Sequence, residues 1–133
     1  MRYLVISTHS VLADAFKETA SMIAGKGAVE CIQTFHMTEG LDPQEFLLNI
    51  QEYLKDKDEN DEYLILADLY GASPCNTSLL GFRGKNYRII TGLNLGILLE
   101  AIFAIQGDGC LDDIADNLIS TGTMGIQKVY LAG

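Results

Sequence analysis

Two side chains that can act together chemically each follow an apolar run in this sequence. His9 lies in the small-polar turn 7–10 that follows residues 3–6, and Asp68 comes directly after residues 63–67. If both runs are neighbouring parallel strands, the imidazole and the carboxylate meet at the same edge of a sheet. A carboxylate that accepts from Nδ1–H fixes the tautomer whose Nε2 keeps its lone pair. The pair then predicts a histidine that acts as a nucleophile or a base.

The segment after Asp68 has the composition of an anion-binding turn. It reads Leu-Tyr-Gly-Ala-Ser-Pro-Cys-Asn over residues 69–76 and runs into a helical stretch. We expect Ser73 to be the N-cap of that helix, with Pro74 at its first position and Gly71 allowing a tight turn before it. Free N–H groups and the positive end of a helix dipole suit a phosphoryl group. The alternative is an ordinary capped helix of an α/β protein.

The elements that position these residues alternate between strand and helix patterns. Apolar runs predict strands at residues 3–6, 28–35, 63–67, 87–90 and 126–131. Apolar residues at helical spacing predict helices at 12–23, 43–54, 77–82, 95–105 and 111–119. This order predicts an α/β fold, a doubly wound and mainly parallel open sheet with helices on both faces. The strand 28–35 is expected at the sheet edge, and Ser10 as the N-cap of the first helix.

Two features near the C-terminus suggest contact with a second subunit. The helix 95–105 is apolar nearly all round and needs covering on more than one side, which in so small a domain favours another subunit. The strand 126–131 follows a glycine-rich, loose connection over 121–125 and has no neighbouring strand in the sequence.

Composition narrows the class of protein. The 133 residues are about one domain, 1–133, and nine basic against eighteen acidic residues argue against a nucleic-acid partner. The cysteines lack the spacing of a disulfide framework or a zinc site, so we expect reduced thiols at Cys31, Cys75 and Cys110, with no metal or cofactor. No cleavable leader or bilayer-length apolar stretch is present, which predicts a cytoplasmic protein.

Three motifs together resemble a known family. They are Thr8-His9, then Asp68-x-x-Gly71-x-Ser73-Pro74-x-Asn76, then Gly92-x-Asn94 followed by Leu98-Leu99-Glu100. In order and separation they are similar to the IIA domain of the mannose family (mannose, fructose, sorbose and N-acetylgalactosamine type) of the bacterial sugar phosphotransferase system. That family often has Gly-Thr-His-Gly and Gly-Gly-Ser-Pro-Phe-Asn, so this chain departs at Ser7, Ser10, Ala72 and Cys75. We interpret Cys75 as a small apolar filler, and the alternative is a redox-sensitive thiol activated by a helix N-terminus.

The resemblance implies a phosphocarrier. It would accept a phosphoryl group on Nε2 of its histidine from phosphorylated HPr and pass it to a IIB component that serves a membrane IIC/IID complex. The resemblance assigns catalytic roles to His9, Asp68 and Ser73, and phosphoryl or loop binding to Thr8, Ser10, Gly71, Ala72, Asn76 and Asn94. It also implies a homodimer that exchanges an antiparallel C-terminal strand. Because the chain ends at Gly133 without a linker, we expect the IIB partner to be a separate polypeptide or membrane complex.

Three alternative interpretations remain at this point. The IIA-like phosphotransfer subunit of dihydroxyacetone kinase has a similar turn at residues 7–10 but lacks the Ser-Pro-x-Asn motif. A phosphoaspartate receiver domain needs further acids after its first strand to hold magnesium, and residues 7–10 supply none. A non-enzymatic flavodoxin-like module would bind a flavin or nucleotide, although neither glycine-rich phosphate-binding motif occurs. His36 is expected to be a surface residue.

Overall fold

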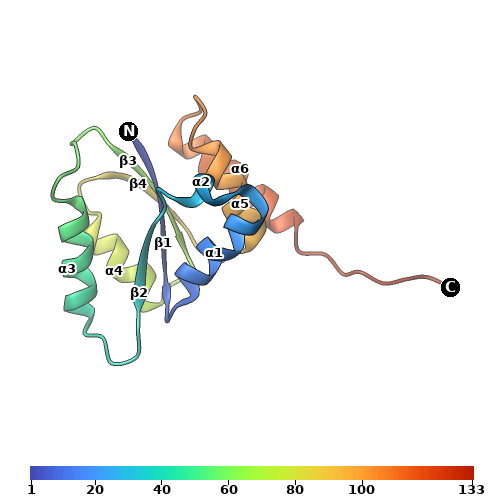
Figure 1. The fold of residues 1–133 in the computed structure, drawn as a ribbon, viewed down its shortest axis with the longest axis horizontal. Helices are drawn as coiled ribbons and strands as arrows, with labels where there is room; N and C mark the ends of the chain where they lie inside the picture. The colour runs from blue at the N-terminus through green and yellow to red at the C-terminus, as the bar shows by residue number, and fades with distance from the viewer.

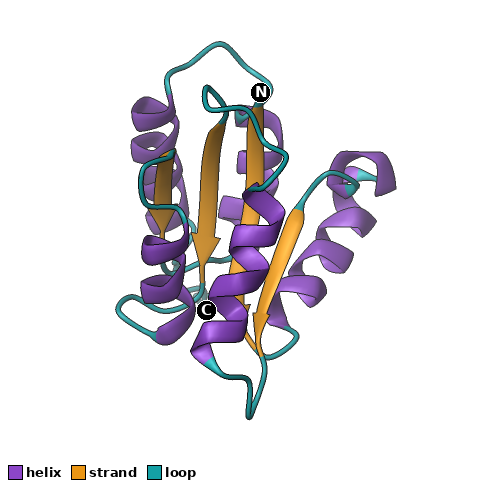
Figure 2. Ribbon diagram, turned by 90° about the vertical axis from the view of Figure 1, so that its left-hand side faces the viewer, coloured by secondary structure: helices purple, strands orange, loops and turns teal.

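The apolar runs lie side by side in a parallel sheet. The computed structural model describes residues Met1–Gly133, with helices on both faces of the sheet (Figures 1 and 2). Its strands run in the order β2-β1-β3-β4, all parallel, with bounds β1 (Arg2–His9), β2 (Gln33–Met37), β3 (Glu62–Ala67) and β4 (Asn86–Ile90). The predicted α/β open parallel sheet is therefore confirmed. The edge position of the second strand is also confirmed.

The register of the two central strands determines where the polar ends meet. Ser7 pairs with Ala67, the last residue of β3, so the strand ends carrying His9 and Asp68 reach the same edge. Both strands are almost entirely buried because helices cover both faces, which explains their continuous apolar runs. The predicted neighbours are therefore next to each other in the sheet.

Two separate cores hold the helices against the sheet. On one face, α1 (Leu12–Ala24), α5 (Leu95–Ala104) and α6 (Leu111–Met124) pack over Leu4, Ile6 and Leu64. On the other face, α3 (Pro43–Leu54) and α4 (Ser73–Gly81) cover the alternate strand residues, with an aromatic cluster between them. The short α2 (Lys26–Val29) connects α1 to the edge strand. None of the helices has the length and apolarity needed to cross a membrane.

Apart from Phe16, which packs against the core, helix α1 buries small residues rather than the large apolar ones whose spacing predicts it. Ala13 and Ala20 are fully buried, whereas Leu12, Met22 and Ile23 are 42, 85 and 62% exposed. Small side chains let the helix backbone approach the sheet closely, and the larger apolar residues then face outward. The single chain therefore leaves an apolar stripe on α1 uncovered.

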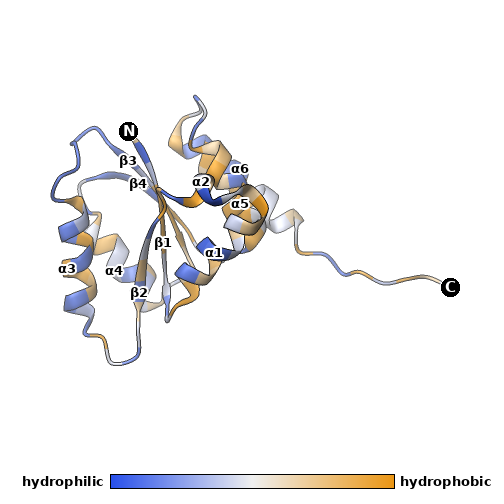
Figure 3. Cartoon of the chain, in the orientation of Figure 1, coloured by the Kyte–Doolittle hydropathy of each residue, from blue (hydrophilic) through white to orange (hydrophobic).

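Helix α5 is covered mostly by its own chain. It contacts both α1 and α6 and buries four residues, Ile97, Leu98, Ala101 and Ile102. Figure 3 shows it as a strongly hydrophobic helix within this layer. Of its apolar side chains, Phe103 is exposed by 62%. The apolar character of α5 thus reflects its position in the core more than a face turned to another subunit.

The predicted strand 28–35 was wrong over its first half. Residues up to Val29 belong to α2, and β2 begins only at Gln33. Val29 and Ile32 are three residues apart, so a helical turn directs both into the core below α1, where they are buried. Burial in a helical turn and burial in a strand give the same apolar pattern over so few residues.

Both predicted serine caps were wrong, whereas the aspartate at the start of α3 does cap it. Ser10 has a φ of 50°, and Thr8 replaces it by accepting the N–H of Ala13 through Oγ1 at 2.8 Å. Ser73 is the first residue of α4 and the extended N-cap is Ala72, whose side chain cannot cap. Asp42 accepts the N–H of Gln44 at 2.9 Å. Local sequence did not reveal that a threonine on the strand supplies the first cap.

The C-terminal region also differs from the prediction. Helix α6 continues through 121–124, so the predicted loose connection is wrong. Gly122 explains the difference, because an added Cβ would lie 2.4 Å from Ile97. The missing side chain lets α6 pack closely against α5 there. Residues 126–133 form no strand in the single chain and extend away from the body (Figure 1).

Candidate functional site

His9 and Asp68 are in direct contact at the carboxyl edge of the sheet. Nδ1 of His9 lies 2.8 Å from Oδ2 of Asp68, and the same oxygen accepts the backbone N–H of His9 at 2.9 Å. A carboxylate can only accept, so the ring proton resides on Nδ1. The His9 side chain is 44% exposed, and its Nε2 has no hydrogen bond within the chain. The exposed nitrogen therefore carries the free lone pair.

Three hydrogen bonds hold Asp68 as a carboxylate. Partial burial raises its pKa, but donation from the backbone and ring of His9 and from the N–H of Leu69 outweighs burial, so the pKa is below its usual value. The side chain is only 10% exposed. The loop after β4 adds a further tie, because the N–H of Gly92 donates to the backbone oxygen of Asp68 at 3.1 Å. The carboxylate is thus ionised and fixed in position near neutral pH.

Ser7 ties the first turn of α4 to the strand that carries His9. Its hydroxyl donates to the backbone oxygen of Pro74 at 3.3 Å and lies 2.9 Å from Oγ of Ser78. Because side chains two apart on a strand point to the same face, α4 begins on the face from which His9 projects. The backbone N–H groups of Ser73 and Cys75 have no acceptor within the chain. Free donors and the positive end of the helix therefore lie on the histidine's side of the sheet.

Most of the other predicted site residues shape the loops. Gly71 has a φ of 74°, and its oxygen accepts from Nδ2 of Asn76 at 2.8 Å, which closes the turn before α4. Asn94 caps α5 by accepting the N–H of Ile97 at 2.9 Å. Ser10 donates its N–H to Met37 on β2, and Thr8 is fully buried. These side chains position the backbone around the histidine, and only Asp68 is hydrogen-bonded to it.

Sequence reasoning missed Ser7 and the free amide of Cys75. A serine inside a buried strand, two residues before the histidine, is the signal that could have identified Ser7. Cys75 itself is buried, in keeping with a small filler, while Cys31 and Cys110 are exposed and free. His36 is not a plain surface residue, since its ring is 28% exposed and its Nε2 lies 3.0 Å from Asp14.

The site contains the groups that phosphoryl transfer through a histidine requires. An oriented imidazole supplies the nucleophile, and uncommitted amides with hydroxyls nearby can stabilise phosphoryl oxygens. No group of three or more histidine, cysteine or acidic side chains is arranged to hold a metal ion. The oriented ring and the free amides fit phosphoryl transfer by positioning and hydrogen bonding.

Comparison with known proteins identifies a family for this chain. Residues 3–118 match the family model EIIA-man, described as "PTS system fructose IIA component". The chain is 30% identical over 126 residues to the PTS system fructose-specific EIIA component of Bacillus subtilis (strain 168), covering 93% of this chain and 84% of that protein. It is 26% identical over 127 residues to the PTS system mannose-specific EIIAB component of Escherichia coli (strain K12), covering 95% of this chain. It spans only 39% of that relative's length.

Solved structures show the same fold. The mannose/sorbose specific IIA subunit from Enterococcus faecalis has a TM-score of 0.88 at 25% identity, covering 99% of this chain and 97% of that one. The EIIA component from Streptococcus agalactiae has a TM-score of 0.83 at 26% identity, with 96% and 97% covered. Both similarities span nearly the whole of each chain.

Proposed function

We propose that Nε2 of His9 is the atom that accepts the phosphoryl group. The chain belongs to the EIIA-man family and is therefore a phosphocarrier of the sugar phosphotransferase system. The observation that carries the proposal is the hydrogen bond between Nδ1 and Asp68, which leaves an exposed Nε2 as the nucleophile. Members of the family act through a phosphorylated histidine, and His9 has the geometry for that role.

The proposed reaction is transfer between two histidines. Nε2 of His9 attacks the phosphorus of phosphorylated HPr, and the bond from phosphorus to the donor nitrogen breaks as the new one forms. The proton on Nδ1 stays in its bond to Asp68, so the phosphorylated ring does not need to exchange it. In the second transfer a nucleophile of the IIB component attacks the same phosphorus, and the bond from phosphorus to Nε2 of His9 breaks. Transfer of this kind depends on position and charge stabilisation.

The first turn of α4 is proposed to receive the phosphoryl oxygens. Its free amides, at Ser73 and Cys75, are supported in this role by their place on the histidine's side of the sheet. The exposed hydroxyl of Ser73 would donate a further hydrogen bond. Thr8, Ser10, Gly71, Ala72, Asn76 and Asn94 would hold the surrounding loops in shape.

We also propose a homodimer that exchanges the C-terminal segment as an antiparallel strand. Two unpaired features support this. Residues 126–133 contribute no strand to their own chain, yet Ile126, Val129 and Leu131 are 78, 88 and 100% exposed. The outer edge of β4 has no neighbouring strand. An unpaired apolar segment and an open edge are complementary in backbone hydrogen bonding.

The physiological partners follow from the proposed chemistry. HPr would be the donor and a IIB component the acceptor, in the cytoplasm and beside a membrane IIC/IID complex. The names of its relatives point to a transporter of the mannose, fructose and sorbose type. Since the chain carries phosphate rather than sugar, those other components would select the sugar.

A reconstituted transfer tests the proposed function. The purified chain is incubated with phosphoenolpyruvate, enzyme I and HPr, and we expect one acid-labile, base-stable phosphoryl group per chain. Adding a IIB component of the mannose type should remove that label, whereas the dihydroxyacetone kinase subunit should not. Label acquired directly from ATP, or label that reaches only dihydroxyacetone kinase, would overturn the proposal.

A further inference from the structure

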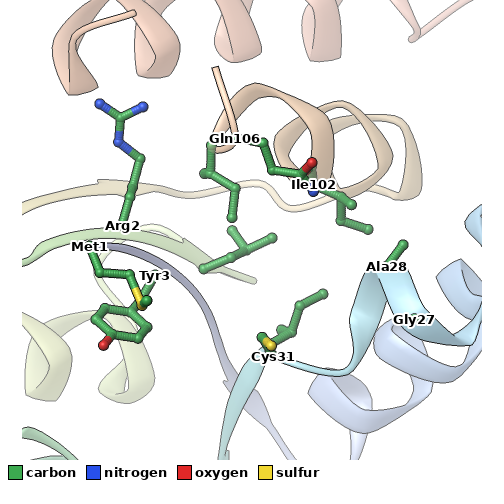
Figure 4. A pocket seen from close by; sticks show the side chains of 11 residues that line it. Met1, Arg2, Tyr3, Gly27, Ala28, Cys31, Ile102 and Gln106 are labelled. Atoms are coloured by element: carbon green, nitrogen blue, oxygen red, sulfur yellow. The ribbon is translucent and has the colours of Figure 1, made fainter. Parts of the chain in front are cut away.

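We propose that a cavity at the sheet edge opposite His9 binds a small, uncharged, apolar molecule with one hydrogen-bond donor. The cavity lies between the start of β1, the α2 turn and the C-terminal end of α5, as Figure 4 shows. It has a volume of about 310 Å³, and 8 of its 11 lining residues are hydrophobic. Ligand pockets in proteins begin at roughly this size.

Both positive charges in the lining are already neutralised within the chain. Arg2 lies 3.0 Å from Glu62, donates to two loop carbonyls, and turns its guanidinium away from the cavity in Figure 4. The amino group of Met1 donates to Asp61 at 2.8 Å. A charged ligand would lose its hydration here without gaining a partner. The lining therefore selects an uncharged molecule.

The side chain of Gln106 offers an acceptor that can orient such a molecule. Nε2 of Gln106 donates to the backbone oxygen of Ile102 at 3.1 Å, so its Oε1 is left as an acceptor. A ligand with a single N–H or O–H can donate to that oxygen, while its apolar body contacts Leu4 and Ile32. This combination of an apolar lining and one acceptor defines the proposed ligand class.

Gly27 gives a way to block the cavity without disturbing the fold. It lines the cavity, and a Cβ added there meets no atom within 4 Å. Its φ is not in the left-handed region, so a side chain adds no backbone strain. Gly27→Leu therefore adds a bulky apolar group at the wall of the cavity, whereas Thr19→Leu adds the same group to the exposed surface of α1 as a matched control.

The test uses N-phenyl-1-naphthylamine, an uncharged fluorescent molecule with one N–H donor. We expect saturable binding with one site per chain, which Gly27→Leu weakens by at least about tenfold and Thr19→Leu leaves within about twofold. In a Cys110→Ser background, where Cys31 is the remaining exposed thiol, bound probe should slow alkylation of Cys31 by N-ethylmaleimide. Gly27→Leu should still accept phosphate from HPr, because residue 27 is remote from His9.

Several outcomes would overturn the proposal. Unsaturable binding, or equal binding by Gly27→Leu and the wild type, would place the probe on the exposed apolar surface instead. Binding that disappears as protein concentration rises would show that a second copy covers the cavity. Unchanged alkylation of Cys31 at saturating probe would also exclude this site.

Discussion

Replacing Asp68 with asparagine tests whether this side chain sets the tautomer of His9. Oδ2 accepts both the backbone N–H and Nδ1–H of His9, while Oδ1 accepts the N–H of Leu69 at 2.9 Å. Asparagine has one acceptor oxygen, so one side of the carboxylate becomes a donor. Either orientation loses the charged acceptor of Nδ1–H: an amide oxygen accepts only as a neutral group, and an amide nitrogen would face the backbone N–H of His9, donate to Nδ1 and shift the proton to Nε2, which removes the nucleophile.

The expected loss follows from the hydrogen bond that disappears. A hydrogen bond to a charged group contributes about 1.5–3 kcal/mol, and its loss disfavours the reactive tautomer by that amount. At about 1.36 kcal/mol per factor of ten, uptake from phosphorylated HPr should slow by about 10-fold to 150-fold. The fold should survive, because the side chain lies at the sheet edge rather than in either core.

Charge repulsion provides a second, separable effect. The carboxylate repels the phosphoryl group and so favours its departure to the IIB component. If repulsion alone operated, Asp68→Asn would take up phosphate normally and keep it longer. Rapid-quench rates in both directions, with imidazole nitrogen shifts from NMR, distinguish the two effects. Uptake rate and tautomer equal to those of the wild type would refute our assignment of Asp68 as the partner of His9.

Asp14→Asn is the matched control, because it removes a carboxylate beside the other histidine. Asp14 lies 3.0 Å from Nε2 of His36 and accepts from Thr34 at 2.8 Å. Its replacement should leave the uptake rate unchanged.

The acid dependence of stability gives an independent check on Asp68. Burial raises its pKa, but the hydrogen bonds from His9 and Leu69 bring it below the ordinary 3.8. A lowered native pKa contributes stability above the unfolded pKa, and this contribution is lost as the pH falls through the native value. The difference in unfolding free energy between wild type and Asp68→Asn should therefore be constant above about pH 5 and shrink in acid.

Three further predictions concern the fold. Deleting residues 126–133 should leave a sheet edge unpaired and give aggregated or poorly folded protein, and a compact soluble monomer in light scattering would contradict strand exchange. Gly122→Ala should lower the unfolding free energy in urea by about 1–3 kcal/mol, because its Cβ would lie 2.4 Å from Ile97. Gly27→Ala is the control and should cause no loss from overpacking, because a Cβ there meets no atom within 4 Å. Equal losses in the two variants would refute this reasoning. Burial raises the pKa of Tyr63 to about 12, so Tyr63→Phe should remove an ionisation step near that pH in an absorbance titration. Because its hydroxyl has no partner, the same change should not lower the unfolding free energy by more than about 1 kcal/mol; a larger loss would reveal an unseen partner.

The central strands could be predicted because most residues of β1 and β3 are buried on both faces of the sheet, which favours apolar side chains. β1 and β3 are continuous apolar runs that end on polar residues, and strands buried on both faces read in that way. The pairing of His9 with Asp68 follows from the parallel order of these two strands. The start of α3 at residue 43 could also be predicted from the sequence, because its cap, Asp42, is the residue directly before it.

The failures occurred where distant contacts decide the local structure. Thr8 caps α1 from the strand, and Ser10 takes a left-handed conformation with its N–H bound to Met37. The glycine-rich pattern placed Gly122 in a loop, but Gly122 lies in α6, where a Cβ would clash with Ile97 of α5. The stripe on α1 shows helical spacing but faces outward, because periodicity does not specify which surface covers it. The conformation of Ser10 and the need for Gly122 each depend on a contact with a residue more than twenty positions away in the sequence.

The position and chemistry of the phosphorylated nitrogen test the central claim most directly. The chain, His9→Ala and His36→Ala are each labelled from phosphorylated HPr, and the modified ring is identified by nitrogen NMR and peptide mapping. Our account predicts one phosphoryl group on Nε2 of His9, none in His9→Ala and an undiminished amount in His36→Ala. Label that survives in His9→Ala, or that lies on Nδ1, would contradict it.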